Sequence, residues 1–122
     1  MKKERYITDE EREKCRKVAN AFEELYELTD IIVVDAGRYG FVKLQYYNPN
    51  AGFDDVITYT DSKTMFEDLW QDYFYDRLLT PVLGTPIAEL EYDDIYKCLS
   101  KETQDEIMAK RAYFKEKSEE NS

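Results

Sequence analysis

Two adjacent carboxylates followed closely by a lysine are the residues of this chain that could do chemistry. Asp54 and Asp55 form the pair, and Asp61 stands two residues before Lys63. Such carboxylates can hold Mg²⁺ and activate water, as in metal-dependent phosphodiesterases and nucleases. In those enzymes the Asp-x-Lys lies on a strand beside the other acid, whereas here it opens a predicted helix, where Asp and Ser are favoured caps. An enzyme with the metal ligands Asp54, Asp55 and Asp61 is therefore an alternative interpretation, and the main expectation is a chain without metal or other cofactor.

Residue type excludes most other catalytic sites. The chain has no histidine, so it cannot form a Ser-His-Asp or Cys-His site by itself. Cys15 and Cys98 have no vicinal cysteine, so zinc-ligand spacing is absent. Glycine-rich phosphate-binding motifs are absent as well. We therefore expect a protein without catalytic activity.

Charge restricts the class of partner. The 122 residues carry a net charge of −10, and 43% of them are hydrophobic. This length and composition predict one folded domain over residues 1–122, with flexible ends at 1–7 and 118–122. An acidic surface repels phosphate, so direct binding to nucleic acid or to an anionic membrane is disfavoured. A protein with a basic surface is the favoured partner.

No feature of the sequence indicates export or membrane insertion. The N-terminal "MKKERYITDE" lacks an apolar signal core. No apolar run approaches the roughly 20 residues needed to cross a bilayer. We therefore expect a cytoplasmic protein.

Hydrophobic periodicity predicts an α+β fold. Helical spacing and strand alternation indicate, in order, a helix over 9–28, strands over 31–36, 41–47 and 55–60, and helices over 62–79, 93–99 and 101–117. The short connections imply a three-stranded antiparallel sheet with one face covered by helices and the other partly solvated. The order α-β-β-β-α also occurs in the double-stranded-RNA-binding domain, but that module holds phosphates with a basic second helix. Here the second helix is acidic, which opposes RNA binding.

Acidic residues are concentrated in two segments. Residues 54–76 hold seven acids against one lysine, and residues 89–106 hold seven, including Asp93 and Asp94, against two lysines. On the second helix, the i, i+4 and i+8 positions place Asp68, Asp72 and Asp76 in one row, spaced about 6 Å apart. That spacing is close to the distance between phosphates along a DNA strand. The row is either a solvated helix face or a surface that docks on a basic partner as a DNA mimic does.

Tyrosines and one hairpin loop suggest further contact points. The "DAGRYG" stretch predicts a four-residue hairpin connection that presents Arg38 and Tyr39 at its tip. Tyr47 alternates onto one face of the second strand, with Lys43 and Gln45 on the same side. If that face is open, it could bury against a second copy or another partner, so both a monomer and a homodimer remain possible.

Taken together, these features favour a non-enzymatic protein-interaction module. Its most concrete form is an inhibitor or accessory factor of a nucleic-acid-handling protein. The residues expected at the partner interface are Asp61, Asp68, Asp72, Asp76, Asp93, Asp94, Arg38, Tyr39 and Tyr47. The alternatives are the Mg²⁺-dependent enzyme described above and a domain that binds a small ligand between helix and sheet.

Overall fold

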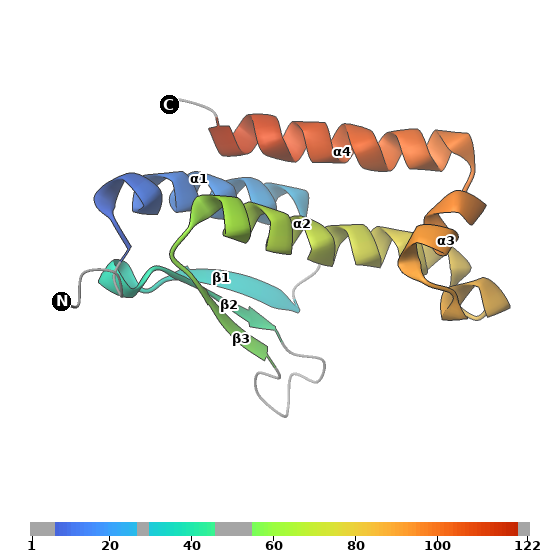
Figure 1. Cartoon of the computed structure of the whole chain (residues 1–122), viewed down its shortest axis with the longest axis horizontal. Coiled ribbons are helices and arrows are strands. Elements are labelled where there is room, and N and C mark those ends of the chain that lie inside the picture. The colour runs from blue at the N-terminus through green and yellow to red at the C-terminus, as the bar shows by residue number, and fades with distance from the viewer. Residues whose placement is uncertain (1–6, 27–29, 46–54, 120–122) are drawn as a thin grey trace.

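The sheet and the helices form three layers in the computed structural model (Figure 1). The structure describes residues 7–26, 30–45 and 55–119. Its helices are α1 (Asp9–Leu25), α2 (Ser62–Leu79), α3 (Tyr92–Cys98) and α4 (Lys101–Glu119), and its strands are β1 (Ile31–Asp35), β2 (Phe41–Gln45) and β3 (Asp55–Tyr59). The three strands form one antiparallel sheet in the order β1-β2-β3. The predicted α+β fold and the order of its elements are confirmed.

Helices α1 and α2 lie over one face of the sheet, and α4 packs on their far side (Figure 1). Phe114 of α4 is fully buried, with its ring centroid 4.5 Å from that of Phe66 and 6.2 Å from that of Phe22. These three rings join the first, the second and the last long helix. The core therefore lies on both sides of α1 and α2, and α2 buries Met65, Leu69, Trp70 and Tyr73 as well.

Side-chain caps fix where the long helices begin. Asp61 accepts hydrogen bonds from the Thr64 backbone N–H and hydroxyl, at 2.8 and 2.6 Å, and so caps α2. Ser100 accepts from the Thr103 N–H at 3.1 Å at the start of α4.

Thr8 and Glu11 have the spacing of a capping box at the start of α1, but only half of that box is formed. Thr8 accepts from the Glu11 N–H at 3.1 Å as expected. The Glu11 carboxylate accepts instead from the N–H and the hydroxyl of Ser62, at 2.8 and 2.9 Å. Glu11 thus ties the first turn of α1 to the first turn of α2.

The hairpin between β1 and β2 has a five-residue connection, Ala36–Gly40, which is one residue longer than predicted because β1 ends at Asp35. Gly37–Tyr39 make one turn of 3-10 helix, and Gly37 and Gly40 have φ angles of 67° and 101°. The Gly40 carbonyl accepts from the Ala36 N–H at 2.8 Å. A Cβ atom on Gly40 would lie 2.1 Å from the backbone carbonyl oxygen of Tyr59, whereas one on Gly37 would meet nothing within 4 Å. Gly40 therefore allows the hairpin to approach the end of β3.

Some residues of the ranges expected to be flexible are packed against the rest of the chain. Ile7 is buried and its N–H donates to the Arg38 carbonyl at 3.0 Å, so residue 7 is held against the hairpin. Ser118 is buried and its hydroxyl donates to the Phe114 carbonyl at 2.7 Å. Ile7, Ser118 and Glu119 thus belong to the described structure, and the rest of the ranges expected to be flexible lies outside the described residues. Within the described part of the chain, no helix is long and apolar enough to cross a membrane.

The two hairpin glycines give a matched test of this geometry. We expect Gly37→Ala to lower the free energy of unfolding by about 1 kcal/mol, because only the positive φ is disfavoured. Gly40→Ala should cost about 3 kcal/mol or more, because the new Cβ also meets the Tyr59 carbonyl. Urea unfolding of both variants measures the difference. Equal losses for the two would contradict the close approach at Gly40.

Candidate functional site

A buried lysine lies at the centre of the contact between sheet and helices. Lys43 on β2 is only 3% exposed, and its Nζ is 2.7 Å from a carboxylate oxygen of Asp72 and 3.3 Å from one of Asp68. The Tyr59 hydroxyl on β3 donates to the same oxygen of Asp68. One ammonium, two carboxylates and one phenol therefore form a polar cluster between α2 and the sheet.

The pKa values in this cluster reflect burial and pairing. Burial alone would lower the pKa of Lys43, but its hydrogen bonds and its attraction to Asp72 and Asp68 raise that pKa overall. Burial raises the pKa of Asp72, and Lys43 counters this only in part. Burial also raises the pKa of Tyr59, and the hydrogen bond to Asp68 raises it further. These groups therefore form a charged structural cluster with a protonated Tyr59 at neutral pH.

This cluster changes the interpretation of the acidic row on α2. Asp68, Asp72 and Asp76 do lie on one side of the helix and are all partly buried. Two of the three carboxylates contact Lys43, so half of the charge of that pair is compensated within the chain. The row is therefore neither a fully solvated helix face nor a set of three free carboxylates. A basic groove could not pair with all three carboxylates of α2 unless Lys43 released Asp68 and Asp72.

The other acidic residues lie in different surroundings. The Asp61 carboxylate caps α2, and its hydrogen bonds to Thr64 lower its pKa. Asp93 and Asp94 are exposed in the first turn of α3. The same end of the molecule carries five more exposed acids, namely Glu89, Glu91, Glu102, Asp105 and Glu106. The exposed acidic surface is thus at α3 and the start of α4, away from the sheet (Figure 1).

The residues of the alternative metal site are not brought together by the described structure. Among the described residues, no group of three or more acids or cysteines is placed to hold a metal ion. Asp61 belongs to the cap of α2 and Lys63 is exposed. Asp54 lies outside the described residues, as does the side chain of Asp55.

The sheet face opposite the helices carries apolar side chains. Because Lys43 points toward the helices, its neighbours Val42 and Leu44 point away from them. The strand register places Ile32 and Val56 on either side of Leu44, and Val34 and Thr58 on either side of Val42. Ile32 and Val34 are each 41% exposed and Val56 is 62% exposed. We call this surface, formed by Ile32, Val34, Val42, Leu44 and Val56, the open sheet face.

Such a face is unusual for a solvated sheet. The outer face of an antiparallel sheet is normally polar when it meets water. Here five of the six outward positions in the described strands are aliphatic, and Thr58 is the exception. The remaining predicted contact residues, Arg38 and Tyr39, are exposed at the hairpin tip, and Tyr47 lies outside the described residues. The open sheet face is therefore the strongest candidate functional surface in the described structure.

Sequence reasoning missed which face would be apolar. It expected Tyr47 near an open face together with Lys43 and Gln45, but Lys43 lies on the face that the helices cover. One signal was available: the "IIVV" of β1 is apolar at every position, as for a strand with two apolar faces. Nothing local indicated that Asp68 and Asp72 would hold Lys43, because the partners are 25 and 29 residues apart.

Comparisons with protein-family models, with curated proteins and with solved structures each found no match.

Substitution of Lys43 tests whether the cluster is structural. We expect Lys43→Ala to lower the free energy of unfolding by about 3 kcal/mol, because it leaves two carboxylates without their cation. Asp76→Asn is the matched control, since Asp76 shares the row but has no contact with Lys43 in the described structure, and it should change stability by less than about 0.5 kcal/mol. Combining Lys43→Met with Asp72→Asn should cost less than the sum of the single changes. Additive costs in denaturant titrations would show that the pair is not coupled.

Alkaline pH provides a second test of the same cluster. The pKa values of Tyr59 and Lys43 are raised above their ordinary values of 10.0 and 10.5. A raised pKa in the folded state gives stability that is present below the unfolded value and lost as pH rises through the folded value. The free energy of unfolding should therefore fall above about pH 10. The fall should be shallower in a Tyr59→Phe, Lys43→Met double variant, and an identical pH profile would rule out this role.

Proposed function

We propose that this chain is a non-catalytic protein-interaction module that binds a partner protein through the open sheet face. The observation that carries the proposal is the set of five aliphatic side chains on the sheet face that no helix of the described residues covers. A contiguous exposed apolar surface is a common feature of protein interaction sites. Burial against a partner would remove the unfavourable contact of Ile32, Val34 and Val56 with water.

The open sheet face is too small to be a whole interface, so we propose that it forms the centre of a larger one. With strands about 4.8 Å apart and a rise of about 3.4 Å per residue, three five-residue strands cover about 240 Å². A stable interface buries about 800 Å² on each partner. Apolar side chains at the centre and polar side chains around them are the usual composition of an interface. Arg38 and Tyr39, exposed at the hairpin tip, are suited to that surrounding rim.

Charge favours a different protein over a second copy as the occupant. Each chain carries a net charge of −10, so two copies repel each other as they approach. A partner with an apolar patch surrounded by lysine and arginine gains the same apolar burial and is attracted. The exposed acids at α3 and the start of α4 add to this long-range attraction.

A narrower form of the proposal is that the partner handles nucleic acid and is inhibited by this chain. Its support is the acidic charge, which would compete with phosphate for a basic groove. In that case the acids between residues 89 and 106, including Asp93 and Asp94, supply the charge rather than the row on α2, because they are exposed.

Crosslinking followed by mutation tests the proposal. A photoreactive amino acid placed at Val56 should crosslink in the native host to a different protein with a basic surface. The Val34→Asp, Val56→Asp double variant should fold normally, since both side chains are exposed, and should bind the purified partner at least tenfold more weakly. Raising the salt concentration should also weaken the binding of the unmodified chain.

Ala109→Asp with Ala112→Asp is the control, because it adds the same charge to exposed positions of α4. This control should bind as the unmodified chain does. A crosslink only to a second copy, a partner without a basic surface, or full binding by the sheet variant would each refute the proposal.

A further inference from the structure

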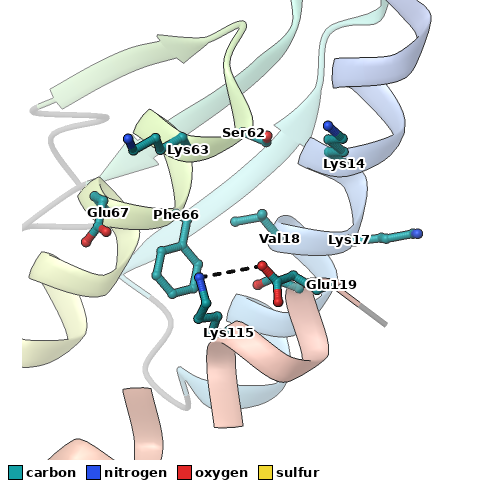
Figure 2. A pocket seen from close by; sticks show the side chains of 10 residues that line it. Lys14, Lys17, Val18, Ser62, Lys63, Phe66, Glu67, Lys115 and Glu119 are labelled. Carbon is teal, nitrogen blue, oxygen red and sulfur yellow. Dashed lines mark ion pairs between the residues drawn. The ribbon is translucent and has the colours of Figure 1, made fainter. Parts of the chain in front are cut away.

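A cleft with cationic walls lies where three helices meet, at the end of the molecule opposite α3. It has a volume of about 460 Å³ and is formed by the N-terminal half of α1, the first turns of α2 and the last turns of α4 (Figure 2). Ligand pockets in proteins have volumes of about 300 to 1,000 Å³. The cleft is therefore large enough for a small organic molecule.

The charge of the cleft is opposite to that of the whole chain. Four lysines line it, and the acids among the lining residues are Glu67 and Glu119. The lysines come from three helices: Lys14 and Lys17 from α1, Lys63 from α2 and Lys115 from α4. On a protein with a net charge of −10, this is a local concentration of positive charge. Such a concentration attracts anions.

The two lining carboxylates are already engaged. Both oxygens of Glu67 accept from the guanidinium of Arg111, at 3.1 and 2.9 Å. Glu119 lies 3.5 Å from the Nζ of Lys115 on the same helix. Lys14 has equally loose contacts, 3.3 Å from Glu10 and 3.6 Å from Glu11. Exposed ion pairs of this kind contribute little, so these lysines can turn toward a bound anion at small cost.

The floor of the cleft is apolar and well packed. Val18 and Phe66 form it, and both are buried, at 3% and 9% exposure. The Phe66 ring is held by stacking on Phe114 at 4.5 Å and by the Arg111 guanidinium, 5.3 Å from its centre. A flat apolar body can therefore rest on a preformed surface while its charged group meets the lysines.

We infer that this cleft binds a small amphipathic anion, that is, a molecule in which a carboxylate, sulfonate or phosphate is attached to an aromatic or short aliphatic body. The cationic walls select the charge and the apolar floor selects the body. A free inorganic anion would interact only with the lysines of the walls, and a neutral apolar molecule would contact only the apolar floor. The site is separate from the open sheet face, so either proposal can fail without the other.

Three probes separate the contributions of wall and floor. 2-Naphthalenesulfonate carries both features, 2-naphthalenemethanol has the same rings without the charge, and inorganic phosphate has charge without an apolar body. Calorimetry should show that the sulfonate binds at least tenfold more tightly than either of the others. Amide NMR shifts caused by the sulfonate should map to residues 14–18, 62–67 and 115–118.

Charge-reversed variants identify the lysines. Lys63→Glu with Lys115→Glu should weaken sulfonate binding about tenfold or more, and the Gln pair should weaken it less, because it removes charge without reversing it. Lys97→Glu with Lys101→Glu is the matched control: it changes the net charge equally but alters exposed residues of α3 and α4 at the far end of the molecule (Figure 1). That control should keep most of the affinity.

Several results would overturn the inference. They are equal binding of the alcohol or of phosphate, unchanged affinity in the Lys63, Lys115 variants, equal loss in the Lys97, Lys101 control, or NMR shifts confined to the open sheet face. Unfolding curves for every variant ensure that a loss of binding is not a loss of folding.

Discussion

The ion pairs between Lys43 and the two aspartates of α2 allow a face of the sheet that carries a lysine to pack against the helices. A strand with Phe41 and Lys43 on one side and Val42 and Leu44 on the other could place either side against the helices. In the structure, Lys43 reaches Asp68 and Asp72, so β2 turns its valine and leucine outward. The strand register then sets β1 and β3 the same way. The open sheet face is thus the reverse side of strands whose other face buries Ile31, Phe41 and Tyr59 around the neutralised Lys43.

A second consequence of the layered arrangement is that charge is separated along the molecule. The acids between residues 89 and 106 gather at α3 and the start of α4, whereas the lysines of the cleft gather where α1, α2 and the end of α4 meet (Figure 1). The lysines of the cleft are not neighbours in the sequence. Packing of the three helices brings Lys14, Lys63 and Lys115 together. The net charge of −10 therefore conceals a site of the opposite sign.

Local sequence signals predicted the helices and strands well, but they could not predict which side chains distant in the sequence would pair. The limits of α2 follow from the Asp61 cap and from Pro81 beyond its end, and the hairpin follows from the spacing of Gly37 and Gly40. The half-formed capping box of α1 could not be predicted from the sequence, because the Glu11 carboxylate accepts a hydrogen bond from Ser62, 51 residues away. The same is true of Lys43, whose burial depends on two carboxylates of another element. Periodicity finds an apolar stripe but does not say which polar residue a distant partner will neutralise.

The position of Phe114 also bears on the order in which the chain can fold during synthesis. The hairpins and the helices of residues 9–79 involve contacts that form early as the chain emerges, and Lys43 can meet α2 without the C-terminal helix. Phe22 and Phe66, in contrast, remain uncovered on the outer side until residue 114 has left the ribosome. The nascent chain therefore passes through a stage in which the outer side of α1 and α2 is exposed, and α4 covers that side last.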